Sequence, residues 1–278
     1  MIRFSTVVFV ACALAAFGCR AHAAEPAAHR GLDIRVEGED WQVPAPAVQE
    51  ALYAAADTLL PYLRSVPAAP IVVTHTNGPP VTLYQRGPNG EYLVHLHASG
   101  ARWALYVYEF AHELTHIVAN YDRNAGPEIV RHNQWLEESL CETASLFALD
   151  RVASAWKGMP ANDRRAALAG SLRSFYDSLV GEAHRRLPAG YSFAAWLADN
   201  EPRLRSDPYE RRQDDLVAKR LLPLFEQDPG GWAAVGYLNL DRGDNDATLG
   251  QYLGHWYGNV PAVQRPFVEV VRAALAAR

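Results

Sequence analysis

The sequence has 278 residues and carries 26 Lys and Arg against 31 Asp and Glu, for a formal net charge of −5 at pH 7. A moderately acidic chain does not bind nucleic acid through bulk electrostatics, so we expect no nucleic-acid partner. The chain is long enough to bury one substantial hydrophobic core, which must hold the protein together.

The first 23 residues have the features of a secretory signal peptide. Arg3 precedes an apolar run over residues 4–18 that is too short to span a membrane comfortably, and Ala-His-Ala at residues 21–23 is a small-x-small cleavage site. Cleavage after Ala23 predicts a secreted or periplasmic protein. The alternative is a lipoprotein acylated at Cys19, although Ala-Phe-Gly before this cysteine is a weak lipobox.

Cleavage at that position also changes the charge and the cysteine content. It removes two Arg and no acidic residue, so the mature chain is two units more negative than the whole sequence. Cys12 and Cys19 leave with the peptide, which leaves Cys141 alone and excludes a disulfide within the chain. No later stretch reaches the length of a membrane span.

The mature chain is predicted to begin with a small sheet. Apolar periodicity predicts a strand over residues 31–37, an amphipathic helix over 46–63 and a short strand over 71–74. Two further strands, 81–86 and 92–97, are joined by Gly-Pro-Asn-Gly, which is a strong hairpin turn.

Helices dominate from residue 102 onward. Segments punctuated by Pro or Gly predict helical stretches near residues 161–186, 192–199, 208–226, 230–239, 246–257 and 261–277. The predicted fold class is therefore α+β, with an α/β lobe over residues 24–157 and a mostly helical lobe over residues 158–278.

Residues 112–116 read His-Glu-Leu-Thr-His, the H-E-x-x-H pattern, inside an otherwise apolar helical segment. Residues i and i+4 share one face of a helix, so His112 and His116 can direct their imidazole nitrogens at one metal ion. Glu113 lies beside that face and can reach a water bound to the metal. The alternative is a helix whose two histidines are satisfied by hydrogen bonds.

A catalytic zinc site needs a third protein ligand, and three carboxylates follow the motif. Asp122 would give a variant of the short-spaced metzincin pattern, but that pattern has Gly where this chain has Ala119, and Ala does not favour the sharp turn. Glu137 and Glu138 open a second predicted helix, residues 134–156. Two antiparallel helices joined in this way can offer His, His and Glu to one ion.

Residues 135–142 read Trp-Leu-Glu-Glu-Ser-Leu-Cys-Glu, and together with the H-E-x-x-H pattern they resemble the gluzincins, the thermolysin-like and aminopeptidase-like superfamily of zinc peptidases. Many gluzincins carry Trp-Leu-x-Glu-Gly-Leu-Ala-Glu at this place. The resemblance covers about residues 91–150 and departs from the family at Ser139 and Cys141. The chain also lacks the Gly-x-Met-Glu-Asn signature of aminopeptidase N-like enzymes, so we do not expect that activity.

The resemblance implies a ligand set. Glu138 matches the third zinc ligand, and Glu142 matches an acidic residue that hydrogen-bonds a zinc-bound histidine and orients it. Glu137 is the variable position, about 100° around the helix from Glu138, and is expected to face solvent or the loop. Cys141 can approach the metal, although a buried, inert thiol is the favoured interpretation.

The resemblance also implies where a substrate lies. In gluzincins the strand before the zinc helix lies at the sheet edge and pairs with the substrate backbone, and residues 91–97 correspond to it. His95 and His97 share one face of this strand. A solvated polar face is the favoured interpretation, and substrate contacts or a second metal pair are the alternatives.

An oxyanion donor is expected from the second lobe, because gluzincins supply a Tyr or His from there. Tyr252, His255 and Tyr257 are candidates, with core aromatic packing as the alternative. His132, in the loop between the two ligand helices, is a further residue that can face the cleft.

The sequence therefore predicts an exported, zincin-like peptidase with one Zn²⁺ per chain and a peptide or protein substrate. Its zinc ligands are predicted to be His112, His116 and Glu138. Glu113 is predicted to take the proton of the attacking water and deliver it to the leaving amine. The alternatives are a non-catalytic zinc- or protein-binding module on the same fold, and a zinc amidase that acts on cell-wall peptide.

Overall fold

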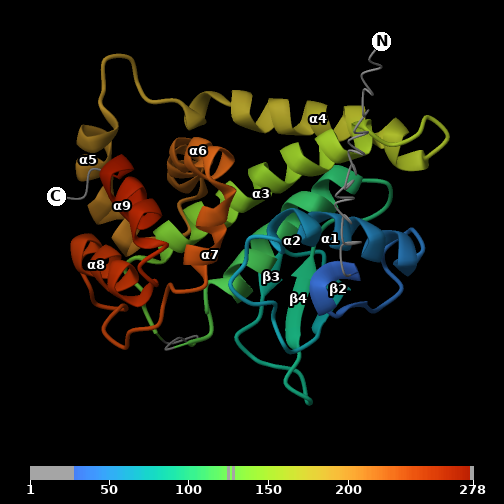
Figure 1. Cartoon of the computed structure of the whole chain (residues 1–278), viewed down its shortest axis with the longest axis horizontal. Coiled ribbons are helices and arrows are strands. Elements are labelled where there is room, and N and C mark those ends of the chain that lie inside the picture. The colour runs from blue at the N-terminus through green and yellow to red at the C-terminus, as the bar shows by residue number, and fades with distance from the viewer. Residues whose placement is uncertain (1–27, 124–125, 127–128, 276–278) are drawn as a thin grey trace, which may run out of the picture.

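A computed structural model describes residues 28–123, 126 and 129–275 of the chain (Figure 1). The predicted signal peptide, its cleavage site and Cys19 lie outside these residues. The described chain is α+β, with a small sheet followed by a long series of helices, as the sequence predicts.

The sheet is mixed and has the strand order β1-β2-β4-β3. Strands β1 (Ile34–Val36), β2 (Ile71–His75) and β4 (Tyr92–Leu96) run parallel, and β3 (Val81–Thr82) pairs with β4 in the antiparallel direction. Alternate residues of β2 and β4 are buried, which places one face of the sheet against the core.

The predicted hairpin is present, but its first strand is much shorter than predicted. The turn is closed by hydrogen bonds from Gly87 N–H to the Glu91 carbonyl and from Gly90 N–H to the Gly87 carbonyl, and Gly90 has a φ of 85° that favours glycine. The strand before the zinc-motif helix, β4, lies between β2 and β3. The prediction that residues 91–97 form the sheet edge is therefore wrong, because the hairpin folds β3 back over that side.

Three helices of the first lobe surround the motif. Helix α1 (Ala45–Leu59) and helix α2 (Trp103–Val118) pack against each other, and α2 packs against α3 (Gln134–Lys157). Helix α2 ends where Asn120 adopts a left-handed φ of 59°, a conformation that Asn tolerates better than most residues.

Helix α3 is buried on nearly all sides, which explains why its sequence has no polar face. It runs between the sheet side of the molecule and the C-terminal helices (Figure 1). Its small polar residues are satisfied internally: the hydroxyls of Ser139, Thr143 and Ser145 donate to the carbonyls of residues one turn earlier, at 2.7–3.2 Å.

The C-terminal part is helical, close to the predicted boundaries. The helices are α4 (Arg164–Gly181), η2 (Ala183–Arg185), α5 (Phe193–Ser206), α6 (Arg211–Gln227), η3 (Pro229–Gly231), α7 (Trp232–Val235), α8 (Leu249–Asn259) and α9 (Arg265–Ala274). Several starts are capped by side chains: Asp163 caps α4, Ser192 caps α5, and Thr248 forms a capping box with Gln251 at α8.

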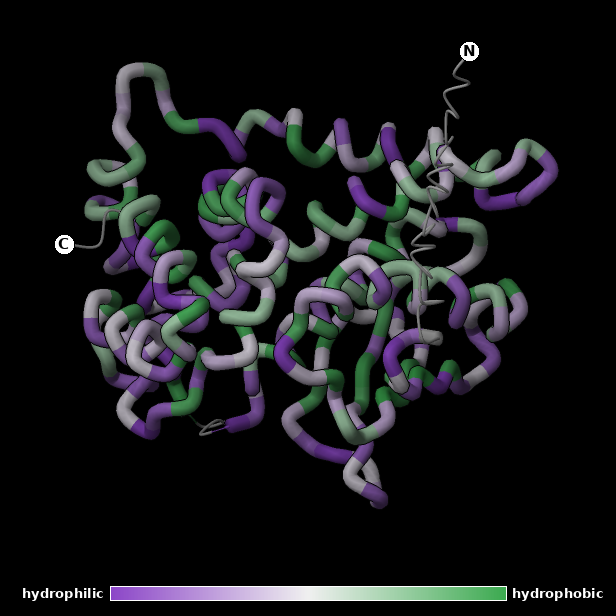
Figure 2. The backbone as a smooth tube through the Cα atoms, viewed as in Figure 1, coloured by the Kyte–Doolittle hydropathy of each residue, from purple (hydrophilic) through white to green (hydrophobic). Residues whose placement is uncertain are grey.

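The buried apolar residues form one hydrophobic cluster that extends from Leu32 to Leu275. Hydrophobic segments run through the strands and the inner helices, whereas hydrophilic segments predominate in the outer loops (Figure 2). Within the described ranges, no helix combines the length and apolar character that crossing a membrane requires.

Candidate metal centre

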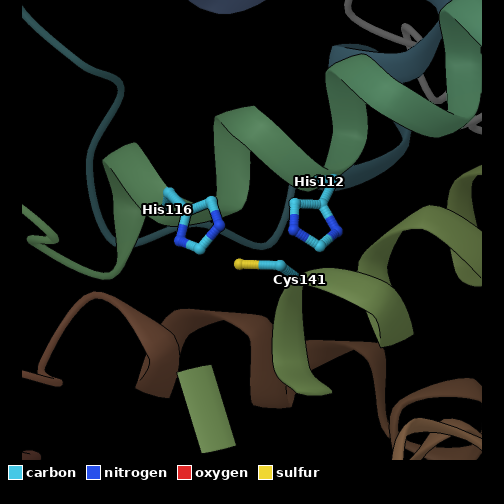
Figure 3. Close-up of side chains that lie close together, drawn as sticks. All are labelled: His112, His116 and Cys141. Atoms are coloured by element: carbon cyan, nitrogen blue, oxygen red, sulfur yellow. The ribbon is translucent and has the colours of Figure 1, made fainter. Parts of the chain in front are cut away.

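The two histidines of the motif face helix α3. His112 and His116 lie one turn apart on α2, with ring centroids separated by 5.0 Å, and their rings project toward α3 (Figure 3). The contacts between the helices run in opposite directions along the sequence, from His116 with Glu137 to Tyr108 with Glu142. The two helices are therefore antiparallel, as predicted.

Glu138 meets both histidines. Its Oε2 atom lies 3.2 Å from Nε2 of His112 and 3.5 Å from Nε2 of His116. Two ligand atoms that bind one tetrahedral zinc at about 2.0–2.1 Å are about 3.3 Å apart. The distances of Oε2 of Glu138 from the two histidine nitrogens are close to this value. Two imidazole nitrogens and a carboxylate oxygen also suit zinc better than calcium or magnesium, which prefer oxygen ligands.

The prediction that Glu137 faces solvent or the loop is wrong. Its side chain is fully buried, and Oε1 accepts a hydrogen bond from Nδ1 of His116 at 2.7 Å. That bond fixes the orientation of the imidazole and turns Nε2, 3.5 Å from Oε2 of Glu138, toward the other two groups. Glu137 thus performs the orienting role that the resemblance assigned to Glu142.

Glu137 is held in turn by groups from outside α3. Its Oε2 accepts hydrogen bonds from Arg131 at 3.0 Å and from the amide of Asn239 at 2.7 Å. The carbonyl of the Asn239 amide accepts from the hydroxyl of Tyr252 at 2.8 Å. Burial opposes ionisation of Glu137, but Arg131 and His116 outweigh it and lower the pKa of this carboxyl.

Glu113 lies beside the histidines and is anchored by the edge strand. Its carboxyl Oε2 accepts a hydrogen bond at 2.8 Å from the hydroxyl of Thr82 on β3, and the side chain is 2% exposed. This contact fixes the orientation of the carboxylate. It joins residues 31 positions apart, so the spacing along the sequence gave no signal of it.

Cys141 also reaches this centre. Its Sγ atom and one ring nitrogen from each of His112 and His116 all lie within 4.8 Å of one another (Figure 3). The thiol is buried, and burial raises its pKa to about 12 even though His116 acts in the opposite direction.

The ionisation of the centre reflects the mutual attraction of its groups. Burial opposes the charge on Glu138, but His116 and His112 outweigh it and hold the pKa of Glu138 below its ordinary range. Burial likewise opposes the charge on His116, but Cys141 and Glu138 outweigh it and raise the pKa of that imidazole well above its usual value.

The residues of the centre line a cleft of about 880 Å³. One side of the cleft is formed by residues 77–82, which lead into and include β3, and the floor is formed by α2 and α3. The opposite side comes from the second lobe: Tyr209 in the loop between α5 and α6, and Arg211, Asp214 and Asp215 at the start of α6.

Two of these second-lobe residues were missed by the sequence interpretation. The hydroxyl of Tyr209 accepts a hydrogen bond at 3.0 Å from the amide of Gln134, whose nitrogen also lies 3.4 Å from Oε1 of Glu138. Asp214 is 4% exposed, its Oδ1 has no hydrogen-bond partner among the described residues, and burial together with Glu138 raises its pKa to about 9.

Glu142 belongs to a different buried network. In the described structure it contacts Tyr108, whose hydroxyl donates to Oε2, and Arg185, whose Nη2 lies 2.7 Å from Oε1 as an ion pair outside hydrogen-bond geometry. Arg185 also pairs with Asp215 at 3.3 Å. The predicted hydrogen bond from a motif histidine to Glu142 is thus replaced by contacts of Glu142 with Tyr108 and Arg185.

The rival third ligand, Asp122, points away from the centre. It accepts two hydrogen bonds from the guanidinium of Arg86, at 2.6 and 3.0 Å. The chain reverses at Asn120 after α2, rather than at Ala119 as the short-spaced pattern would require. The structure therefore does not bring Asp122 to the histidines.

The remaining predicted residues are placed as follows. His97 lines the cleft, whereas His95 lies within β4 opposite Val81, and neither belongs to a group of metal-ligating side chains in the described part of the chain. His132 donates from Nδ1 to the carbonyl of Arg205, 3.1 Å away, and lines a separate depression.

The aromatic candidates of the second lobe are not on the cleft wall. Tyr252 is buried and acts through Asn239 and Glu137. His255 hydrogen-bonds Asp244 at 2.8 Å, and the guanidinium groups of Arg265 and Arg272 each lie over the ring of Tyr257. Tyr209 is the second-lobe tyrosine that lines the cleft.

Comparison with known proteins adds no relative to this description. No protein-family model, no curated protein and no solved structure matches the chain.

Proposed function

We propose that the protein is an exported, zinc-dependent peptidase with a zincin-like arrangement of its active site. The observation that carries this proposal is the convergence of Nε2 of His112, Nε2 of His116 and Oε2 of Glu138 at separations of 3.2 and 3.5 Å, beside the carboxylate of Glu113. Two histidines and one carboxylate are a ligand set that leaves a coordination position open, as a hydrolytic zinc site requires.

A zinc ion held by these three residues supplies a Lewis acid for an amide carbonyl and for the attacking water. Glu113 takes a proton from that water and delivers it to the leaving amine, because its carboxylate borders the cleft and is held in one orientation by Thr82. Tyr209 faces the same space from the second lobe and donates a hydrogen bond to the developing oxyanion.

The shape of the cleft favours a peptide in extended conformation. Strand β3 is the exposed edge of the sheet, and residues 77–82 form the cleft wall next to Glu113. An unpaired strand edge binds a substrate backbone through main-chain hydrogen bonds. We propose that the substrate lies along β3, in place of the strand over residues 91–97 that the sequence indicated.

The decisive test is cleavage of a mixed peptide library by the purified protein, with and without a chelator. Hydrolysis should depend on zinc, and Glu113→Gln should lower it by at least about a hundredfold while zinc stays bound. Glu50→Gln, a remote change on exposed α1 surface, is the matched control and should retain full activity. Near-normal turnover in Glu113→Gln would refute the proposed mechanism, and folded protein that binds no zinc would refute the proposal as a whole.

A further inference from the structure

We propose that Cys141 is a fourth protein ligand of the metal centre, and that its thiolate competes with water for the position left open by His112, His116 and Glu138. The inference rests on the proposed function, because it concerns the same ion. It adds a ligand that the gluzincin pattern does not contain and a closed, latent form of the site.

The first observation is positional. Sγ of Cys141 lies within 4.8 Å of a ring nitrogen of both His112 and His116, and these nitrogens lie within 4.8 Å of each other (Figure 3). Ligand atoms of one tetrahedral zinc lie closer together than this limit, and Glu138 is not part of the group, so side chains must move to bring the sulfur to the usual zinc–sulfur distance of about 2.3 Å.

The second observation concerns the surroundings of the thiol. Cys141 is fully buried in helix α3, three residues beyond Glu138. Its side chain projects from α3 toward the rings of His112 and His116 (Figure 3). The thiol is therefore directed at the two histidines of the motif.

The third observation is the direction of approach. Glu113, Glu138 and both histidines border the cleft, whereas Cys141 is not among the described residues that line it. The thiol therefore reaches the centre from the interior side of α3, and a substrate reaches it from the cleft. Sulfur and water therefore approach the ion from different sides and compete for its fourth coordination position rather than for space in the cleft.

The chemistry makes the two forms exclusive. Zinc in protein sites is almost always four-coordinate, and two histidines, one glutamate and one thiolate complete that number. When sulfur binds, the thiol loses its proton to solvent and the position for water is filled. When sulfur leaves, it regains a proton and water binds in its place. No electron is transferred in either direction.

X-ray absorption at the zinc edge tests the inference on the purified, zinc-loaded protein. A sulfur scatterer at about 2.3 Å is resolved from nitrogen and oxygen scatterers at about 2.0–2.1 Å. We expect one sulfur per zinc in the wild type and none in Cys141→Ser, which keeps the size of the side chain. Ser139→Ala, on the same buried helix but bonded to the carbonyl of Trp135, is the matched control and should retain the sulfur shell.

Turnover of the same variants tests the competition. Cys141→Ser removes the competing thiolate and should hydrolyse peptides faster than the wild type, while Ser139→Ala should not. A zinc shell of nitrogen and oxygen alone in the wild type would overturn the inference and leave the proposed function intact. Protein that binds no zinc would overturn both. A sulfur shell combined with unchanged turnover in Cys141→Ser would overturn the competition.

Discussion

The buried carboxylate of Glu137 determines how the imidazole of His116 is oriented in the centre. It accepts a hydrogen bond from Nδ1 of His116 and is itself held by Arg131 and Asn239, so the histidine has little freedom to turn. Hydrogen bonds of this kind to metal-bound histidines typically contribute about 10–100-fold to metal affinity.

Glu137→Gln should therefore weaken zinc binding by about 10–100-fold, and Glu138→Ala should weaken it more because it removes a ligand. Competition with a chelator of known affinity measures both. Asp122→Ala is the control, since Asp122 pairs with Arg86 and should not affect zinc. A zinc-deficient Asp122→Ala would contradict the assignment of the third ligand and favour the short-spaced metzincin arrangement.

Thr82 is a positioning residue for the general base. Its hydroxyl donates to Glu113 across 2.8 Å in a buried setting, and a hydrogen bond to a charged group of this kind contributes about 1.5–3 kcal/mol. Thr82→Val should lower kcat for peptide hydrolysis by about tenfold or more with little change in KM, because the carboxylate loses the hydrogen bond that orients it.

Thr82→Ser restores the donor and should restore kcat. A valine variant with the wild-type kcat would show that the hydroxyl does not act on Glu113. These readouts distinguish positioning from a loss of folding, which would lower the rate in Thr82→Ser and Thr82→Val alike.

The sequence was sufficient to predict the arrangement of site residues within one helix. It was not sufficient to predict contacts between residues that are far apart along the chain. The i, i+4 spacing was enough to place His112 and His116 on one face, and the Trp-Leu register was enough to select Glu138 over Asp122. The sequence could not place Glu137. The angle of about 100° between neighbouring helical residues implies that one of them faces solvent only when one side of the helix is exposed. Helix α3 is buried on both sides, so Glu138 faces His112 and His116 while Glu137 faces His116 and Asn239.

At the scale of elements, helices were predicted more accurately than strands. The helices of the second lobe carry their own boundary signals, such as Asp163, Ser192 and Thr248 at their starts. Strand β3 has two residues and is defined by its partner rather than by its own pattern, so the segment 81–86 was overextended and β4 was assigned to the edge.

The junction of η3 with α9 offers a test of packing between elements. A Cβ atom at Gly231 would lie 2.3–2.6 Å from three ring atoms of Phe267, and Phe267 packs against Phe225 in the core. Gly231→Ala should lower the free energy of unfolding by about 1–3 kcal/mol, because the aromatic cluster must shift.

Gly170→Ala is the matched control for that change. Gly170 lies within α4 with no atom in reach of an added Cβ, so alanine should raise helix stability by about 0.5–1 kcal/mol. Chemical denaturation of both variants gives the comparison. Equal effects of the two substitutions would contradict the described packing of Phe267.

At the scale of the whole molecule, the two sides of the cleft are joined through the centre. Asn239 of the second lobe bonds both Glu137 and the carbonyl of Ala119, and α3 contacts helices of both lobes. The predicted lobes are therefore joined by a shared core and by the network that orients His116. The sequence could not indicate this link, because residues 119, 137 and 239 are far apart along the chain.

The acidic groups that meet at the cleft give the molecule a characteristic dependence on pH. Burial is the main reason that the pKa of Asp214 rises from an ordinary 3.8 to about 9, and the charges of Glu138, Asp215 and Glu142 act in the same direction. Between these two values the folded protein retains a proton that the unfolded chain releases. Stability therefore falls as pH rises through this range, by up to about 1.4 kcal/mol per pH unit.

Asp214→Asn removes this dependence, because an amide does not ionise. In chelator-treated protein, where Glu138 keeps its charge, the variant and the wild type should have similar stability near pH 4. The variant should then become progressively more stable than the wild type up to about pH 9, after which the difference should stay constant. Thermal unfolding across this range measures the difference, and Asp246→Asn, at an exposed position in the second lobe, is the control. Unfolding curves for Asp214→Asn that follow the wild type at every pH would show that Asp214 does not keep its proton in the folded protein and would contradict this account.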